Sequence, residues 1–234
     1  MFKLEGESRE TTSIPKAAFI SGGWLGTEAA VALTSASAAA QIHYTTDGSL
    51  PTKQARVYDS PLTLRRGQTL RARAIQSGAA ASDELRVALG VMRINFQPAS
   101  APVPAGYAAD TGEAFGSRAD GAAYGWSSDN TAQTRQRGQG GVPDTFCHFL
   151  AQQKWESAVP AGRFAMRVLL GDASFPSQNA INSEGVNLCR DLSISSGTKV
   201  FTGEVEVKDG RLTVDCGDSP ERMTKIAAIE ITAQ

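Results

Sequence analysis

The sequence predicts an all-β protein made of two consecutive β-sandwiches. Apolar residues alternate with polar ones through most of the chain, which is the pattern of half-buried strands rather than of helices. Turn-forming residues, including Asp-Gly pairs, separate the alternating runs. The 234 residues are 41% hydrophobic and 20% charged, a composition typical of folded globular proteins, and the length leaves room for two domains.

The alternating runs occur in both halves of the chain. They predict strands over seven segments: 41–46, 69–75, 85–89, 91–96, 164–170, 203–207 and 211–215. Asp209-Gly210 joins the last two, and we expect a β-hairpin there because Asp-Gly favours the positive φ angles of a type I′ turn. Two Ala-rich segments, 36–40 and 79–81, are flanked by Ser and Gly. We interpret them as strand ends and loops rather than as helix.

A domain boundary is expected near Gly90. One predicted strand ends at residue 89, and a new alternating run begins at Val91 with no long linker between them. A loop rich in Pro, Ala and Gly follows at 98–106. We therefore predict one domain over residues 1–90 and a second over residues 91–234.

Charge and hydropathy exclude two classes of partner. The chain has 23 Lys and Arg against 24 Asp and Glu, a net charge of −1, whereas a nucleic-acid-binding surface needs a clustered excess of basic residues. The best apolar stretch, 36–42, is far shorter than the roughly 20 residues that span a bilayer. We expect neither nucleic-acid binding nor membrane insertion. The charged N-terminal sequence MFKLEGESRE also lacks the apolar run of a secretory signal.

The three cysteines, Cys147, Cys189 and Cys216, all lie in the second half of the chain. They are too few for a disulfide scaffold, and no CxxC spacing indicates zinc binding or thiol redox chemistry. An odd number leaves at least one thiol free. A single bridge between Cys189 and Cys216 is compatible with the sequence but not required, because the expected hairpin at Asp209-Gly210 places Cys216 near a strand end.

The first domain carries a specific motif. Residues 42–52 read IHYTTDGSLPT, followed by YDSPLTL at 58–64 and QTLRARAI at 68–75. Over roughly residues 14–89 the chain resembles the immunoglobulin-like domain found at the C-terminus of chitobiases and β-hexosaminidases. The resemblance implies an immunoglobulin-like β-sandwich that serves as a spacer or packing domain. We interpret Asp47 as a turn residue rather than a catalytic acid.

The second domain resembles the galactose-binding-like, malectin-like β-sandwiches of bacterial polysaccharide-processing and surface proteins. The segments that carry the resemblance are INFQP (94–98), GYAADTG (106–112), YGW (124–126), TRQR (134–137), DTFCHF (144–149), WESAVPAGRF (155–164), LGD (170–172), VKDGRLTV (207–214) and KIAAIEI (225–231). The resemblance implies a jelly roll whose end loops or concave face bind sugars.

Candidate ligand-binding residues come from two irregular regions of this second domain. Sugars stack their C–H faces on aromatic rings, and planar polar groups bridge neighbouring hydroxyls or a uronate. The Gly-rich region before Pro143 has too few apolar residues to be core, and a second irregular segment follows the 164–170 strand. Loops on a rigid scaffold often carry binding residues. From these regions we predict contacts by Tyr124, Trp126, Arg135, Arg137, Asp172 and Phe175.

Three of these residues, Trp126, Arg135 and Arg137, have a structural alternative. Trp126 lies in a Tyr-Gly-Trp strand and is compatible with a core position, as is Trp155 just before another strand. Arg135 and Arg137 alternate on one strand face, so they either contact ligand or pair with Asp144 or Asp172. His148, between Cys147 and Phe149, is interpreted as a core histidine.

We expect no organic cofactor and no catalysis. A structural calcium ion is common in sandwich modules of this kind, and Asp110, Asp129 and Asn130 are the residues we assign to such a site. The sequence contains no Gly-x-Ser-x-Gly elbow, HExxH, P-loop or GxGxxG motif. Cys147 and His148 are adjacent in a strand and therefore point to opposite faces, which argues against a catalytic dyad.

The sequence therefore predicts a non-catalytic carbohydrate-binding or adhesion module with an immunoglobulin-like spacer, and a polysaccharide or glycan as its partner. The alternative is a structural, decoration or adhesion protein of a phage virion or another extracellular assembly, bound to other copies or subunits. That alternative follows from two extracellular domain types combined with Met1 and no export signal. Under either interpretation we expect an extracellular location or one on a cell or virion surface.

Overall fold

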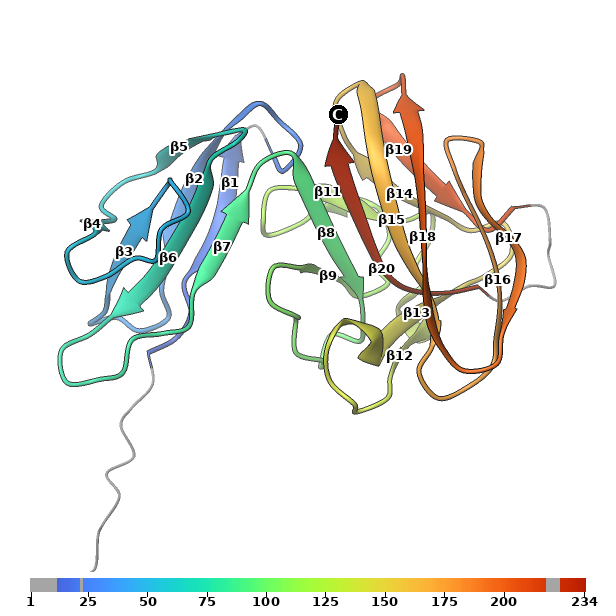
Figure 1. The fold of residues 1–234 in the computed structure, drawn as a ribbon, viewed down its shortest axis with the longest axis horizontal. Helices are drawn as coiled ribbons and strands as arrows, with labels where there is room; N and C mark the ends of the chain where they lie inside the picture. Colours follow the sequence, from blue (N-terminus) through green and yellow to red (C-terminus); the bar gives the residue numbers. More distant parts are fainter. Residues whose placement is uncertain (1–11, 22, 218–223) are drawn as a thin grey trace, which may run out of the picture. The chain divides into compact units, whose positions relative to one another are not determined.

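The computed structural model describes residues 12–21, 23–217 and 224–234, so the N-terminal sequence searched for a secretory signal lies outside it. The chain forms two compact units (Figure 1). The first comprises the chain up to Gly23 together with Thr27–Leu89, and the second comprises Trp24–Gly26 together with Gly90–Gln234. None of the helices in the described ranges has the length and apolar character needed to cross a bilayer.

The first unit is an antiparallel sandwich of two sheets (Figure 1). The described residues give a three-stranded sheet in the order β1-β2-β5 and a four-stranded sheet in the order β4-β3-β6-β7. The strands are β1 (Lys16–Ser21), β2 (Glu28–Thr34), β3 (Gln41–Thr45), β4 (Arg56–Val57), β5 (Leu62–Arg65), β6 (Thr69–Ile75) and β7 (Leu85–Ala88). In β6 every second side chain is buried, which is the alternation the sequence predicted. Val31, Leu64 and Leu70 are completely buried in this unit.

The second unit contains two larger sheets. In the described residues one sheet has seven strands, with the path β12-β13-β20-β15-β18 extended by β8 and β9, and the other has six in the order β10-β11-β14-β19-β16-β17. The strands are β8 (Val91–Phe96), β9 (Ala108–Asp110), β10 (Gly116–Ser117), β11 (Ala123–Trp126), β12 (Thr134–Gln136), β13 (Thr145–Phe149), β14 (Lys154–Ala158), β15 (Gly162–Asp172), β16 (Ser177–Ser183), β17 (Val186–Ile194), β18 (Gly197–Val207), β19 (Arg211–Asp215) and β20 (Thr224–Ala233). Two short 3₁₀ helices, η1 (Thr131–Gln133) and η2 (Val142–Asp144), lie beside β12 and β13.

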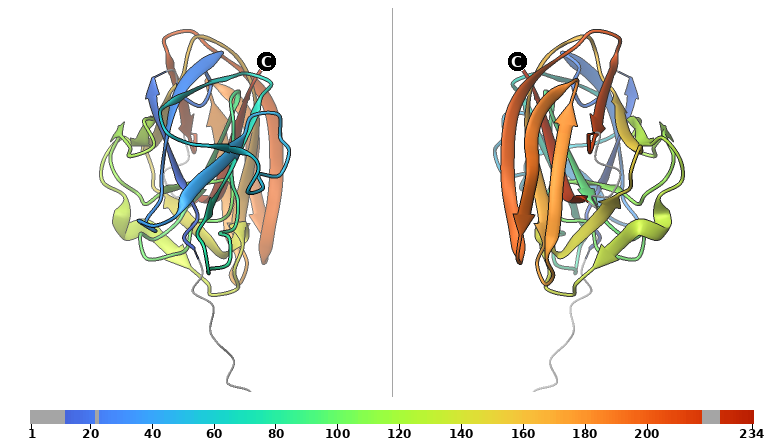
Figure 2. Two further views of the ribbon diagram at one scale, coloured as in Figure 1. Left: turned by 90° about the vertical axis from the view of Figure 1, so that its left-hand side faces the viewer. Right: turned by 90° about the vertical axis from the view of Figure 1, so that its right-hand side faces the viewer.

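The core of the second unit lies between its two sheets. Phe96, Trp126 and Trp155 belong to one buried cluster, in which the Phe96 ring meets both indoles edge-on at centroid distances of 5.8 and 5.7 Å. Strand β15 contributes alternate residues to the same cluster, and Figure 2 (right) shows the C-terminal strands side by side. The prediction of an all-β protein built from sandwiches is therefore confirmed.

The last strand of the chain is central to the seven-stranded sheet. Strand β20 pairs with β15 along one edge, and its other edge pairs with β13 over 224–226 and with β8 over 228–232. The backbone N–H of Ala233 donates to the carbonyl of Gly90 at 2.8 Å. The first and last strands of this unit are therefore neighbours.

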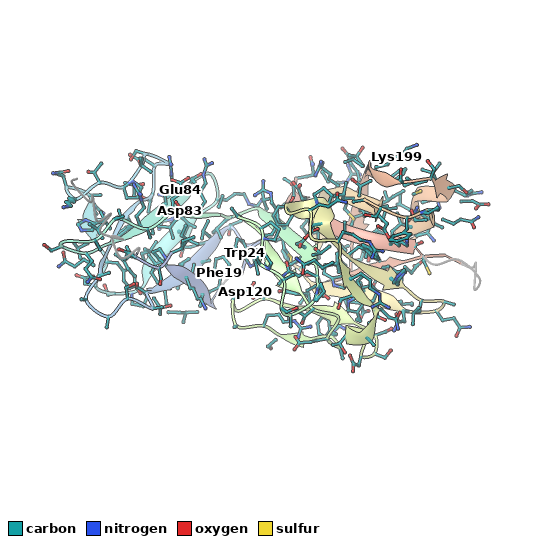
Figure 3. All side chains as sticks on the ribbon, turned by 90° about the horizontal axis from the view of Figure 1, so that it is seen from below. Phe19, Trp24, Asp83, Glu84, Asp120 and Lys199 are labelled. Atoms are coloured by element: carbon teal, nitrogen blue, oxygen red, sulfur yellow. The ribbon has the colours of Figure 1, made fainter. Side chains whose placement is uncertain are left out.

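A three-residue segment from early in the chain belongs to the second unit. Leu25 is buried in its core cluster. The indole N–H of Trp24 donates to the Asp120 carboxylate at 3.2 Å, and Figure 3 shows the two side chains next to each other. The carbonyl of Trp24 also accepts a hydrogen bond from the backbone N–H of Gly90.

The prediction of a β-hairpin at Asp209-Gly210 is wrong. Strand β18 pairs with β15 in the seven-stranded sheet, whereas β19 pairs with β14 and β16 in the other sheet. The turn itself forms, with Gly210 at φ +83° and the Asp209 carboxylate accepting the Arg211 N–H. It connects the two layers because both flanking strands have apolar residues that face the shared core.

The three cysteines are free thiols. The Cys189 thiol donates to the carbonyl of Asn179 at 3.6 Å, and the Cys216 thiol donates to the carbonyl of Leu150 at 3.6 Å. The Cys189–Cys216 bridge considered from the sequence is therefore not formed. The hairpin that was expected to place Cys216 for that bridge is also absent.

Candidate functional site

Two of the predicted ligand contacts, Tyr124 and Trp126, are buried in the core and their assignment as surface contacts is corrected. Tyr124 is 2% exposed and donates its hydroxyl to the carbonyl of Ala109, and Trp126 is 0% exposed. The indole N–H groups of Trp126 and Trp155 each donate to the Asp110 carboxylate at 2.8 Å. Both tryptophans therefore take the core alternative.

Asp110 is a structural acceptor at the centre of this unit. Its Oδ1 accepts from Trp126 and from the backbone N–H of Gly112, and its Oδ2 accepts from Trp155. Burial raises the pKa of Asp110, and the three N–H donors offset only part of that effect. Strand β9 ends at this residue, so the register of β9 beside β8 places the carboxylate under the two indoles.

The three residues assigned to calcium have separate partners. The Asp110 carboxylate is engaged by N–H donors, and exposed Asp129 accepts the backbone N–H of Thr131. The Asn130 amide donates to Cys147 Sγ and to the carbonyl of His148, while its buried Oδ1 has no partner in the described structure. Across the described ranges, no group of three His, Cys, Asp or Glu side chains forms a metal site.

Three other predicted residues, Arg137, Asp172 and Phe175, come together at the end of β15. Asp172 is 0% exposed and its carboxylate accepts two parallel hydrogen bonds from Arg137, Nε to Oδ1 at 2.8 Å and Nη2 to Oδ2 at 2.6 Å. Lys225 Nζ also donates to Oδ2 at 2.8 Å. The sequence left two roles open for Arg137, ligand contact and pairing with an aspartate. Pairing with Asp172 is observed, and it uses only some of the N–H groups of the guanidinium.

Aromatic rings enclose this arginine. The guanidinium carbon of Arg137 lies 5.0 Å from the centroid of the buried Phe146 ring and 4.6 Å from that of Phe175. Phe175 is 54% exposed, whereas Phe146 is fully buried. Lys225 Nζ lies 5.3 Å from the Phe146 centroid. We call Arg137, Phe146, Asp172, Phe175 and Lys225 the arginine cluster.

Local structure fixes the arginine cluster in place. In β13, Cys147 and Phe149 face the main core, so Phe146 and His148 face the opposite side of the sheet. The β13–β20 register sets His148 opposite Lys225. At the end of β15, the backbone N–H of Ser174 donates to Asp172 Oδ1 at 3.0 Å, a local turn that precedes Phe175.

The charges in the arginine cluster perturb two titrating groups. Burial would raise the pKa of Asp172, but hydrogen bonds from Arg137 and Lys225 outweigh it, so this pKa is held well below the usual range. For His148, burial followed by the positive charges of Lys225 and Arg135 lowers the pKa to about 4. The histidine is therefore neutral at physiological pH, and its Nδ1 is buried without a hydrogen-bond partner in the described structure.

Arg135, the remaining predicted residue, is exposed beside the arginine cluster. Its Nη1 donates to the carbonyls of Ala132 and Thr134, each at 2.7 Å. It does not pair with Asp144, whose buried carboxylate accepts the backbone N–H of Gln139 and the amide of Gln136. Burial alone would raise the pKa of Asp144, but these hydrogen bonds lower it.

Sequence reasoning missed Lys225 and Phe146. Lys225 stands in an apolar strand, KIAAIEI, where a lone lysine at the strand start would normally be solvated. Its burial needs a carboxylate 53 residues away in the chain. A signal was nevertheless present, because a basic residue at the start of a mostly apolar strand requires a counter-charge when that strand is central.

Comparison with known proteins identifies the type of the first unit. The family model of the chitobiase/beta-hexosaminidase C-terminal domain matches residues 20–85. The first sandwich thus matches a known family. That match confirms the resemblance seen in the sequence and indicates a carbohydrate-related β-sandwich module. No curated protein sequence gives a significant match to the chain.

Solved structures with some likeness to the chain come from diverse proteins. The YxiM protein of Bacillus subtilis is 19% identical with a TM-score of 0.45, and the match covers 62% of this chain and 40% of that one. The plant receptor-like kinase FER is 15% identical, TM-score 0.44, with 62% and 42% covered. A Bacteroides uniformis beta-glucuronidase is 12% identical, TM-score 0.41, with 94% and 30% covered. The chain spans less than half the length of each of these three structures.

Proposed function

We propose that the chain is a non-catalytic carbohydrate-binding module, with the second unit as the binding domain and the first as its spacer. The observation that carries this proposal is Phe175, an aromatic ring more than half exposed and stacked on the Arg137 guanidinium. Arg137 is in turn fixed by the fully buried Asp172 carboxylate. A sugar ring stacks on such a surface at a low ordering cost, because the aromatic platform is already held in place.

The family of the first unit supports this proposal. Its model is named for the C-terminal domain of chitobiase and beta-hexosaminidase, and both names refer to carbohydrates. Within this unit Asp47 has a turn role, since its carboxylate accepts the backbone N–H and the hydroxyl of Ser49 at 2.9 and 2.7 Å. That role fits a spacer. The jelly-roll, galactose-binding-like character of the second unit belongs to the same proposal.

The placement of Cys147 and His148 supports a non-catalytic role. Cys147 is completely buried in the main core, and burial raises the pKa of its thiol, which keeps it protonated. His148 faces the other side of the sheet, against the ring of Phe146 at a centroid distance of 5.2 Å. The two side chains therefore cannot act together as nucleophile and base.

Calorimetric titration of the full chain with a panel of neutral and acidic oligosaccharides tests the proposal. We expect shallow, weak binding, because one exposed ring offers little apolar area. Phe175→Ala should abolish detectable binding. Val200→Ala is the matched control, since Val200 is an exposed apolar residue on β18 of the same unit and lies outside the arginine cluster.

Two outcomes would overturn the proposal. Equal binding by wild type and Phe175→Ala would place any glycan site elsewhere. Absence of binding to every oligosaccharide tested would favour the alternative of a structural component of a virion or another extracellular assembly. Under the proposed function the module works outside the cell or on a cell or virion surface, where polysaccharides are encountered.

A further inference from the structure

We infer that the arginine cluster selects acidic saccharides, binding a carboxylate or sulfate group through the part of Arg137 that Asp172 leaves unused. The inference rests on the proposed function and names its ligand class. A guanidinium carries five N–H donors. Asp172 takes one from Nε and one from Nη2. Three remain, and those on Nη1 and Nη2 form a second planar fork of the kind that matches a carboxylate or a sulfate.

This second fork is available to a ligand. No described residue accepts a hydrogen bond from Arg137 Nη1, and the Arg137 side chain is 21% exposed. Phe146 and Phe175 both lie near the guanidinium, so the edge of the group rather than its faces is left for hydrogen bonding. The first fork also fixes the orientation of the second, because bidentate pairing to a buried carboxylate prevents rotation of the guanidinium.

The accessible charge around the second fork is positive. Asp172 is the carboxylate that contacts the Arg137 guanidinium, and Asp144 accepts the Arg137 backbone N–H through its own carbonyl. These two residues are 0% and 4% exposed, and both carboxylates accept hydrogen bonds from protein donors. Arg135 is exposed on β12, the strand that ends just before Arg137, and Lys225 is held against Asp172. Two buried anions beside three cations leave a net positive local charge, and an arriving anion meets the cations first.

The geometry also places the sugar. Phe175 precedes Pro176 in the loop between β15 and β16, and its ring is 4.6 Å from the same guanidinium that presents the second fork. The guanidinium covers one face of this ring, so a saccharide stacks on the other face, and a charged substituent that extends past the ring edge points toward the second fork. A neutral sugar would fill the stacking position and leave the fork to water. We therefore expect a saccharide with a charged ring substituent to bind more tightly than its neutral counterpart.

The test compares saccharides that differ only in charge. Titration of the full chain with an oligogalacturonate and with its methyl ester keeps the sugar and removes the carboxylate charge. A sulfated galactan oligosaccharide and its desulfated form make the same comparison for sulfate, so the two pairs distinguish the two anion sources. We expect at least one acidic member to bind about tenfold or more tightly than its neutral counterpart, with the difference shrinking as salt is added.

Arg137→Lys keeps the positive charge beside Asp172 and removes the second fork. It should lose the preference for the acidic saccharide while retaining the weak binding of the neutral one. Arg163→Lys is the matched control, because Arg163 is an exposed arginine near the other end of β15. It should leave both affinities unchanged.

The outcomes separate the two proposals. Equal affinity of wild type for charged and neutral members of both pairs would overturn the acidic selectivity and leave carbohydrate binding standing. A preference that survives in Arg137→Lys would overturn the role of the second fork. Binding of none of the four saccharides would remove both proposals. Should Arg137→Lys fail to fold, the wild-type comparison alone still decides the selectivity.

Discussion

Replacing Asp110 by Asn should destabilise the second unit strongly, although the change removes only a charge. Three N–H donors converge on this carboxylate, from Trp126, Gly112 and Trp155. An amide has a single acceptor atom. If its oxygen takes the Oδ1 position, its NH₂ group meets the indole of Trp155, and in the flipped orientation it meets the other two donors.

The magnitude follows from the buried donors. An unsatisfied buried donor costs about 1–3 kcal/mol, and exchanging a charged acceptor for a neutral one weakens each remaining hydrogen bond by about 1 kcal/mol. Burial raises the pKa of Asp110, which shows that the ionised carboxylate itself carries a desolvation cost. Asparagine carries no charge and avoids this desolvation cost, which offsets part of the loss in the free energy of unfolding. We expect a net decrease of about 2–4 kcal/mol in the free energy of unfolding.

Tryptophan fluorescence can follow the unfolding of the second unit, which contains Asp110. The protein has three tryptophans, Trp24, Trp126 and Trp155, and all belong to the second unit. A urea titration followed by their emission therefore reports mainly on unfolding of that unit. Asp129→Asn is the control, because exposed Asp129 accepts one N–H through Oδ1, a bond that an amide oxygen also makes. A loss below about 0.5 kcal/mol for Asp110→Asn would refute this account.

Three further predictions concern titrating groups. Asp172→Ala should cost about 3–5 kcal/mol of unfolding free energy at neutral pH, because it leaves Arg137 and Lys225 without their buried counter-charge. Since the pKa of Asp172 is lowered by folding, its contribution is complete above about pH 4 and fades in acid, so urea titrations of the two proteins should converge there. The imidazole of His148 should titrate near pH 4 by NMR, so its neutral form favours folding above about pH 6.5 and this contribution disappears toward pH 4. The three buried thiols, whose pKa values are all raised, should resist a thiol-specific reagent until urea unfolds the chain.

Each of these three predictions has a result that would contradict it. A stability gap between wild type and Asp172→Ala that does not narrow as the pH falls would mean that the carboxylate is not the stabilising charge. A titration midpoint of the His148 imidazole at the ordinary histidine pKa would show that this side chain is exposed to water. Rapid modification of any cysteine in the native protein would show that its thiol is accessible.

Much of the fold could be predicted from local pattern, because strand alternation is a property of adjacent residues. The predicted strands 69–75 and 91–96 match β6 and β8 to the residue. The turn at Asp209-Gly210 was also predicted, but the strands with which β18 and β19 pair were not. Turn chemistry specifies a reversal of the backbone, whereas the choice between hairpin and inter-sheet connection depends on which distant strands offer a pairing edge.

The candidate site was predicted only in part, for a similar reason. Arg137, Asp172 and Phe175 were selected because glycine and proline marked irregular segments there. The role of Asp110 as acceptor for two indoles was not predicted, because these partners lie 16 and 45 residues further along the chain. A carboxylate in a loop-like stretch has the same local sequence whether it binds a metal or two tryptophans, and only long-range pairing separates these outcomes.

The adjacency of β8 and β20 has a consequence for modular use. Strand β20 is held on one edge by β15 and on the other by β8 and β13, which are all strands of the same unit. The polypeptide also enters at Gly90 and reaches Ala233 at the same place, joined there by a hydrogen bond. Because these ends meet, we expect residues 90–234 to tolerate circular permutation without disruption of a sheet, whereas transfer to another protein would also remove Leu25 from the core.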